Sequence, residues 1–337
     1  MDNQRTPRNY STGTVKRDNR QQQQKLVVIM ICIVIALLLV VFMTIIGTKI
    51  VVALLGGYQN ADPSAVQYKD VTIDKSQSLY GPLALVNNTH EYLFPDKAES
   101  ALVNIWAYKS EHTPENQGSA YKTLNTSIQM NGTALAAAHR WFTDFHAETG
   151  LSDTTIITAH RTYEEQNGKE QAPGQSDHHT GNAIALKVVN TSGTFFLSDV
   201  PEYAWLVENA HKYGFVQRYP EGKENITGVN DYDYCFHYVG DGPATYMKEN
   251  NLCLEEFVAQ IKANTHNNPL QVTDANGQKW LIYYTACQGD VTTVKLPTNF
   301  TYTVSGDNDG GIIVCVSLSK TAYEQQQQQE AESESAQ

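Results

Sequence analysis

The stretches PGQSDHHTGNAIAL (173–186) and RYPEGKENITGVNDYDYCFHYVG (218–240) carry most of the information in this sequence about its fold. Two runs of apolar, β-branched and aromatic residues, NAIALKVV (182–189) and CFHYV (235–239), predict strands. A third stretch, TAHRTYEEQ (158–166), follows another β-branched run. Together the three stretches hold most of the polar and aromatic residues from which a site could be built.

The histidines and the cysteine of these stretches belong to the residue types that bind zinc. His178 and His179 fall in a turn before a predicted strand, and Cys235 and His237 are two apart on another, so both of the latter side chains point to one face. The same residues are common without a metal, however. Adjacent histidines often lie on the surface, and a cysteine outside the cytoplasm is more often in a disulfide. Spacing alone leaves the question of a metal open.

Around these stretches the chain alternates between helices and short strands. Helical spacing of apolar residues predicts a helix over 132–149 that stops at Gly150. Further helices are expected over 202–213 and 254–264, and TTIITA (154–159) is an expected strand. We therefore predict an α+β fold in which helices flank a small antiparallel sheet.

The pattern changes from about residue 270, where short strands alternate with turns. We expect a small all-β appendage over 269–322 and, after it, a disordered acidic and glutamine-rich tail over 323–337. Cys287 and Cys315 both lie in the appendage, so a disulfide between them is expected. Sequence does not fix the pairing, and a bridge between Cys235 and Cys253 stays open.

The N-terminal part contains the uncharged run LVVIMICIVIALLLVVFMTIIG. At about 1.5 Å per residue this run is long enough to cross a hydrocarbon layer of roughly 30 Å. We expect a transmembrane helix over 26–48, a disordered cytoplasmic tail over 1–25 and a juxtamembrane linker over 49–78. The tail is rich in basic residues, which places the main domain outside the cell membrane as a single-pass protein.

Charge is unevenly distributed along the 337 residues. The chain has a formal net charge of −12, and residues 1–25 contain six basic and two acidic residues, so the remainder carries −16. Such an acidic body repels polyanions, and we expect no nucleic-acid partner.

The three stretches resemble the zinc D-alanyl-D-alanine carboxypeptidases and dipeptidases of the VanY type, which trim peptidoglycan stem peptides. The family pattern reads S-G/A-Y-R-S/T-x-x-x-Q, then P-G-x-S-E-H-x-x-G-x-A-x-D, then R-Y-P-x-G-K-x-x-x-T-G-x-x-x-E-P-W-H-x-R-Y-V-G. The match runs almost without gaps over roughly 79–265. It implies a D-Ala-D-Ala carboxypeptidase-like domain over 79–268, and the β appendage resembles a module found behind such domains.

The resemblance also implies which residues would form the catalytic set. His178 matches the first zinc ligand, but Ala185 stands at the Asp ligand and Cys235 at the second His ligand. Tyr232 stands at the glutamate that activates water, and His237 at the arginine of H-x-R. A catalytic zinc needs three protein ligands, and a tyrosine with a pKa near 10 is a poor base. We expect a pseudoenzyme without confident catalytic residues and without a cofactor, although zinc is the family's metal.

Two alternatives keep the site active. Shifting the alignment by two residues would place His237 at the second ligand position, and a rebuilt metal site of His178, Cys235 and His237 is chemically allowed. In the rebuilt site, Asp177 or Asp233 could act as the base, whereas the shifted alignment still leaves Ala185 and no glutamate. Either alternative would give a metallo-D,D-carboxypeptidase with a rearranged zinc site.

Arg161 matches the family arginine that stabilises the developing oxyanion and the peptide end of the substrate. An arginine can bind a carboxylate without a metal, although a structural ion pair with Asp177 or Glu165 is an equal alternative. We expect a peptidoglycan stem peptide or a cell-wall protein as the partner, and a purely structural surface protein is the remaining possibility. The expected cleft residues are Arg161, Gln166, Ser176, His178 and His237.

Overall fold

The computed structural model describes residues 60–95, 102–113, 118–230 and 232–320, which belong to one compact unit that begins at residue 58. The expected tail over 1–25, the expected membrane span over 26–48 and the terminal tail over 323–337 lie outside the described residues. Within the described ranges, no helix is both long and apolar enough to cross a membrane.

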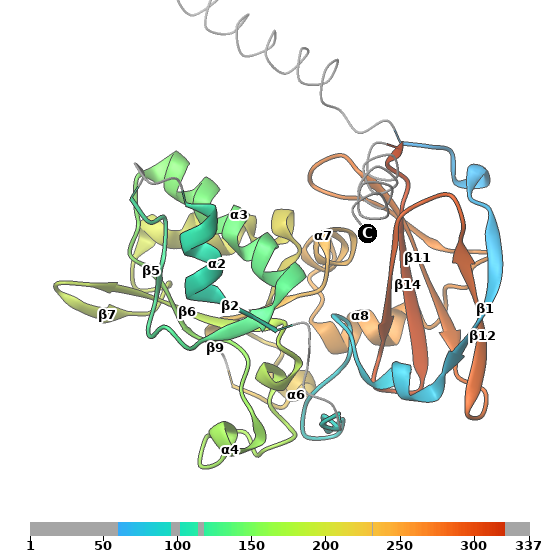
Figure 1. The fold of residues 1–337 in the computed structure, drawn as a ribbon, viewed down its shortest axis with the longest axis horizontal. Coiled ribbons are helices and arrows are strands. Elements are labelled where there is room, and N and C mark those ends of the chain that lie inside the picture. The colour runs from blue at the N-terminus through green and yellow to red at the C-terminus, as the bar shows by residue number, and fades with distance from the viewer. Residues whose placement is uncertain (1–59, 96–101, 114–117, 231, 321–337) are drawn as a thin grey trace, which may run out of the picture. The chain divides into compact units, whose positions relative to one another are not determined.

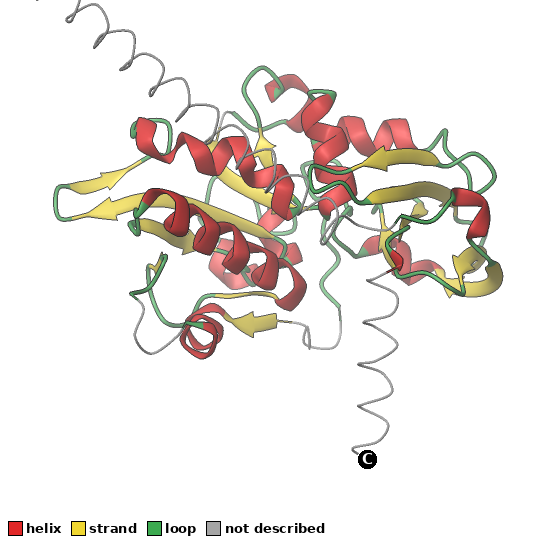
Figure 2. Ribbon diagram, turned by 90° about the horizontal axis from the view of Figure 1, so that it is seen from above, coloured by secondary structure: helices red, strands yellow, loops and turns green. Residues whose placement is uncertain are grey.

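The central sheet confirms the mixed helix and strand class. Its strands are β3 (Lys122–Thr123), β5 (Thr154–Thr158), β6 (Ala183–Asn190), β7 (Gly193–Phe195), β8 (Phe215–Tyr219) and β9 (Tyr232–Tyr238). They follow the order β3–β5–β6–β9–β8, with β7 paired to β6. All neighbours are antiparallel except β3 and β5. The β6–β7 hairpin projects beyond the rest of the sheet (Figures 1 and 2).

Helix α3 (Gly132–Thr149) has the limits that the sequence predicts. Asn131 caps its first turn, and Gly150 ends it in the left-handed region at φ 73°. Its buried face carries Trp141 and Phe142. The two rings stack on each other in the main core. Local capping residues and helical spacing are sufficient to fix this element, because neither depends on a distant partner.

The other helices and minor elements are short. The expected helix over 202–213 is divided into η4 (Pro201–Tyr203), α5 (Ala204–Asn209) and η5 (Ala210–Tyr213). The helix expected from residue 254 is α8 (Leu254–Ile261), and α7 (Asp241–Glu249) precedes it. The remaining elements before β10 are η1 (Pro63–Ala65), η2 (Lys75–Leu79), β2 (Leu102–Asn104), α2 (Ile105–His112), β4 (Gln129–Asn131), α4 (Tyr163–Gln166), η3 (Asp177–Thr180) and α6 (Glu224–Thr227).

The C-terminal strands form a second sheet that shares a core with the helices. It contains β10 (Leu270–Thr273), β11 (Lys279–Ala286), β13 (Tyr302–Gly306) and β14 (Gly311–Ser317), whereas β12 (Val291–Pro297) lies in a separate two-stranded sheet. The sheet order is β10–β11–β14–β13. One face packs on α7 and α8, which lie between this sheet and the central sheet in Figure 1. The β part is therefore packed into the same unit as the central sheet.

A linker was expected over 49–78. The structure describes residues 60–78 of it, and for these the expectation is wrong. Strand β1 (Tyr68–Asp74) pairs antiparallel with β12 over its whole length, from Tyr68 opposite Pro297 to Asp74 opposite Val291. Ile73 of β1 is buried in the core that also holds Val294. The N-terminal segment thus completes the β part of the fold.

The expected disulfide between Cys287 and Cys315 is not formed. Cys287 directly follows β11, beyond the pair of Ala286 with Gly311, whereas Cys315 lies inside β14 opposite Ile282. The two cysteines are therefore five ladder positions apart, or about 16 Å, and a disulfide tolerates a Cα separation of only about 7 Å. They also face different cores, on opposite sides of the sheet.

Cys253 is a free thiol at the start of α8, so the open alternative of a bridge to Cys235 is not formed either. Its backbone N–H donates to Glu256 Oε2 at 2.9 Å. Burial raises the pKa of the Cys253 thiol to about 12, which keeps it protonated.

Asp241, at the first turn of α7, makes the fold sensitive to pH. Burial and the nearby Asp274 carboxylate raise the pKa of Asp241 to about 6, from an ordinary value of 3.8. The folded state then holds the proton more tightly than the unfolded chain. This group costs no stability below about pH 4, and stability is lost as the pH rises through about 6.

Asp241→Asn should therefore raise the free energy of unfolding at pH 7.5 by on the order of 2 kcal/mol, and should change it little at pH 4. Urea denaturation of the purified protein at both pH values measures the difference. An equal effect at the two pH values would contradict this origin of the pH dependence.

Candidate functional site

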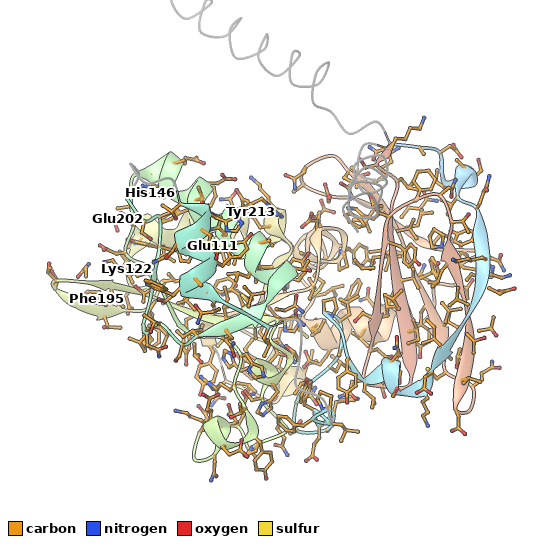
Figure 3. All side chains as sticks on the ribbon, in the orientation of Figure 1. Glu111, Lys122, His146, Phe195, Glu202 and Tyr213 are labelled. Atoms are coloured by element: carbon orange, nitrogen blue, oxygen red, sulfur yellow. The ribbon has the colours of Figure 1, made fainter. Side chains whose placement is uncertain are left out.

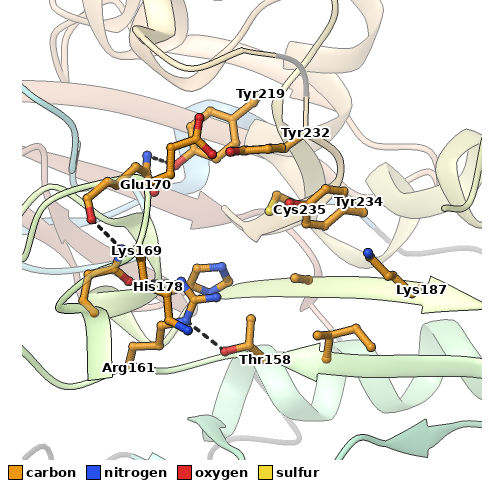
Figure 4. A pocket seen from close by; sticks show the side chains of 14 residues that line it. Thr158, Arg161, Lys169, Glu170, His178, Lys187, Tyr219, Tyr232, Tyr234 and Cys235 are labelled. Carbon is orange, nitrogen blue, oxygen red and sulfur yellow. Dashed lines mark hydrogen bonds between the residues drawn. The ribbon is translucent and has the colours of Figure 1, made fainter. Parts of the chain in front are cut away.

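A cavity of about 260 Å³, which we call the cleft, opens beside the middle of the central sheet (Figure 4). It is formed where β5, α4, η3, β6, β8 and β9 meet, so all three of the polar stretches contribute to it. The residues expected from the family pattern that line it are Arg161, Gln166, His178, Ala185, Tyr232 and Cys235.

The strand register decides which residue stands at the second ligand position. Ala185 of β6 lies directly opposite Cys235 of β9, and His178 is in η3 immediately before β6. These three residues surround one cavity. His237 lies opposite Ala183, deeper in the sheet, and is not among the residues that line the cleft. The alignment without gaps therefore fits the structure, and the alignment shifted by two residues does not.

The expectation that His237 belongs to the cleft is wrong. Its side chain is fully buried, with Nδ1 at 2.5 Å from Asp177 Oδ2 and Nε2 at 2.9 Å from the carbonyl oxygen of Pro82. Both partners are acceptors when Asp177 is ionised, so each ring nitrogen must donate and the imidazole carries a positive charge. The ring cannot offer a lone pair to a metal while it makes these contacts.

Asp177 is the centre of a buried ion cluster. Its Oδ1 lies 3.2 Å from Arg218 Nε, and Arg218 also binds Glu255 through NH2–Oε1 at 2.7 Å and NH1–Oε2 at 3.0 Å. Burial alone would raise the pKa of Asp177, but His237 and Arg218 outweigh it and hold the pKa at about 2. Asp177 is thus ionised and bound on both sides, and it is not placed to act as a base in the cleft.

His178, next in the chain, forms part of the cleft floor. Burial and the nearby Arg161 guanidinium lower its pKa to about 3, so the ring is neutral at pH 7. Ser176, two residues earlier, is fully buried and does not line the cleft, which corrects its expected role. Its Oγ has no hydrogen-bond partner among the residues that the structure describes.

Arg161 is held by neutral groups. Its Nε donates to Thr158 Oγ1 at 3.1 Å and its NH1 donates to Gln166 Oε1 at 3.0 Å. The two carboxylates considered as structural partners are bound elsewhere: Asp177 is in the ion cluster, and Glu165 accepts from the Thr162 backbone N–H at 2.9 Å. Burial lowers the pKa of Arg161 from its high ordinary value, which leaves the guanidinium charged at neutral pH. Its positive charge is therefore directed at the cleft without a close anionic partner among the described side chains.

Comparison with known proteins shows the family of this chain. The family described as "VanY: D-alanyl-D-alanine carboxypeptidase" matches residues 115–241. A D-alanyl-D-alanine carboxypeptidase of Enterococcus faecium is 31% identical over 256 residues, which cover 74% of this chain and 79% of that relative. The chain belongs to the VanY family of D-alanyl-D-alanine carboxypeptidases.

Solved structures are also similar to this chain. The vancomycin-resistance D,D-dipeptidase VanXYg, solved with a D-Ala-D-Ala phosphinate analog, has a TM-score of 0.63 and 26% identity, covering 74% of this chain and 99% of that one. A VanY D,D-pentapeptidase solved in complex with Zn(II) has a TM-score of 0.40 and 23% identity, covering 52% of this chain and 98% of that one.

The donor set around the cleft does not fit the zinc of the VanY family. Of the three ligand positions, His178 and Cys235 carry donor atoms and Ala185 carries none. His237 is in the ion cluster, and across the described ranges no three His, Cys, Asp or Glu side chains are grouped as a metal would require. The side chain of Asp233, considered as a base, lies outside the described part. We therefore derive no catalytic step through a metal.

The sequence did not single out several residues that line the cleft. Tyr219 and Tyr234 add aromatic walls, and Lys187 adds a cation two residues after Ala185. Burial raises the pKa of the Tyr219 phenol, whose oxygen accepts from Gln171 Nε2 at 3.0 Å. The alternation of a strand could have indicated Lys187, because residues i and i+2 face the same side.

The ion cluster should be essential for the stability of the site. His237→Ala leaves Asp177 with one buried cation less, and we expect it to lower the free energy of unfolding by about 3–5 kcal/mol. His237→Arg, which carries the family residue, should restore most of this loss. Urea denaturation at pH 7 measures both.

Lys122 provides the matched control for this measurement, because its ion pair with Asp153, at 2.6 Å, lies at the surface (Figure 3). Lys122→Ala should cost less than about 1 kcal/mol. A loss of that size for His237→Ala would show that the cluster does not carry the stability assigned to it.

Proposed function

We propose that this member of the VanY family is a non-catalytic protein that binds the end of a peptidoglycan stem peptide. In this proposal it is anchored in the cell membrane by one helix over 26–48, with the described domain outside. The observation that supports it is the composition of one cleft. Arg161 and Gln166 are kept there, whereas Ala185, Cys235 and Tyr232 stand at the positions of two metal ligands and the base.

The residues of the cleft suit binding better than hydrolysis. Hydrolysis of a peptide requires a water activated by a metal or by a base whose pKa is near the working pH. Tyr232 is a phenol, His178 is a buried ring held neutral by its surroundings, and Asp177 is already bound by two cations. An arginine held by Thr158 and Gln166, in contrast, can bind a carboxylate or a peptide carbonyl directly.

An active metallo-D,D-carboxypeptidase is the second candidate, supported by two donor-bearing side chains, His178 and Cys235, in one cavity. A purely structural surface protein, in which the cleft has no ligand, is the third. Zinc content and ligand binding separate the three. Under non-chelating conditions we expect well under one zinc per chain and no release of D-alanine from a stem pentapeptide, together with measurable binding of that peptide.

Arg161→Ala should weaken this binding by about 10–100-fold, because a hydrogen bond to a charged group contributes about 1.5–3 kcal/mol. Isothermal titration with a pentapeptide ending in D-Ala-D-Ala gives the affinity, and Lys122→Ala is the control. One zinc per chain with D-alanine release would favour the active enzyme. Absence of peptide binding by the unaltered protein would favour the structural role.

Restoring the family residues tests the assignment of the three positions. We expect the triple variant Ala185→Asp, Cys235→His and Tyr232→Glu to bind about one zinc per chain, because three ligands then surround an open position. Elemental analysis of this variant beside the unaltered protein measures the gain. If the folded triple variant binds no zinc, these residues do not occupy the family's ligand positions.

A further inference from the structure

Lys187 is a half-buried cation at the cleft whose contacts are aromatic. It lies on β6, two residues from Ala185 and on the same face of the strand. Its Nζ is 4.2 Å from the centre of the Phe196 ring and 5.5 Å from the centre of the Tyr234 ring. These two rings contact each other at 5.4 Å between centroids. Together they fix the ammonium group by cation–π attraction.

The ammonium group has hydrogen-bonding capacity that the rings do not use. A lysine ammonium has three N–H donors, and none of those on Lys187 reaches an acceptor among the described side chains and backbone. Position 185 neighbours Lys187 on the same face of β6. It is an alanine here, so it offers no carboxylate to the ammonium group. Lys187 can therefore accept an anion without first breaking an ion pair to that position.

Arg161 and Lys187 lie towards opposite ends of the cleft, with Cys235 between them in the close view (Figure 4). Arg161 is bound to the neutral groups Thr158 and Gln166. The two ends thus present two cations to one cavity of about 260 Å³, which Lys169 and Glu170 also line, in a protein with a net charge of −12. A cavity of this size is smaller than most drug-sized ligand sites, which suits the last residues of a peptide.

We propose that Lys187 is a specificity-determining residue that binds the free C-terminal carboxylate of the peptide, while Arg161 binds the preceding part of its backbone. This inference rests on the proposed function and adds to it the residue that recognises the free C-terminus of the peptide. Recognition is by charge and needs no metal. The Phe196 and Tyr234 rings position the ammonium, so its hydrogen bonds are made with little loss of side-chain freedom.

The test compares two probes, diacetyl-L-lysyl-D-alanyl-D-alanine and its C-terminal amide, by NMR titration of the full-length protein. We expect the unaltered protein to bind the acid at least about tenfold more tightly than the amide. Lys187→Met, which keeps an apolar chain against the two rings, should bind the acid and the amide equally. Lys187→Arg should keep the preference for the acid, and added salt should weaken acid binding more strongly when a cation is present at 187 than in Lys187→Met.

Lys122→Met is the matched control, because Lys122 pairs with Asp153 away from the cleft. The inference is overturned if Lys187→Met keeps the preference for the acid. If Arg161→Ala still weakens both probes in that case, the proposed binding function stands without it. If the unaltered protein binds neither probe, the proposed function and this inference fail together. A thermal melt of each variant identifies one that has lost its fold, and Lys187→Gln then replaces Lys187→Met.

Discussion

The cleft depends on one buried ion cluster. The carboxylate of Asp177 is shared between the Arg218 guanidinium and the His237 ring, and Glu255 neutralises the other side of Arg218. Two cations and two anions are balanced in a space where three of the four side chains are almost completely excluded from water. Buried charges are tolerated only when they are paired, so each member requires the others. Because Asp177 immediately precedes His178, the cluster also fixes the cleft floor.

The cluster also joins parts of the chain that are distant in sequence. Asp177 belongs to η3, Arg218 to β8, His237 to β9 and Glu255 to α8. The loop that follows η2 adds two carbonyl acceptors. The carbonyl oxygen of Pro82 accepts from the His237 ring, and that of Val86 accepts from Arg218. The apolar face of α8 packs against β14 in the C-terminal sheet. A continuous set of contacts therefore runs from the cleft to the β part, which explains why both belong to one compact unit.

The features that sequence predicted are those with local causes. The limits of α3 follow from Asn131 and Gly150, and the position of Cys235 follows from counting residues between two fixed motifs. The contribution of β1 was missed because its partner β12 lies more than 200 residues away. Its alternation of Tyr, Lys, Asp, Val, Thr, Ile and Asp is too polar to indicate a strand without that partner.

Two site predictions failed because they depended on tertiary surroundings. Strand alternation places Cys235 and His237 on the same face, but it cannot show that Asp177 and the Pro82 carbonyl meet the second side chain and remove it from the cleft. Ser176 was expected in the cleft from its place in the motif, but it is fully buried and does not line the cavity. The Cys287–Cys315 pair failed for a different reason, since only the register of β11 with β14 shows that the two residues are five positions apart.

The three departures from the family pattern are physically linked. A family site balances a divalent cation with the carboxylates of an aspartate and a glutamate. Losing the metal alone would leave two anions facing each other in a poorly solvated cleft, and losing the carboxylates alone would leave an uncompensated dication. Ala185 and Tyr232 remove the two carboxylates, and Ala185 and Cys235 replace two of the three metal ligands of the family pattern, so the proposed loss of the metal and the loss of the carboxylates go together. The cleft keeps the charges of Arg161 and, at the other end, of Lys187, beside Lys169 and Glu170, and this charge set is the basis of the proposal that the cleft binds an anion.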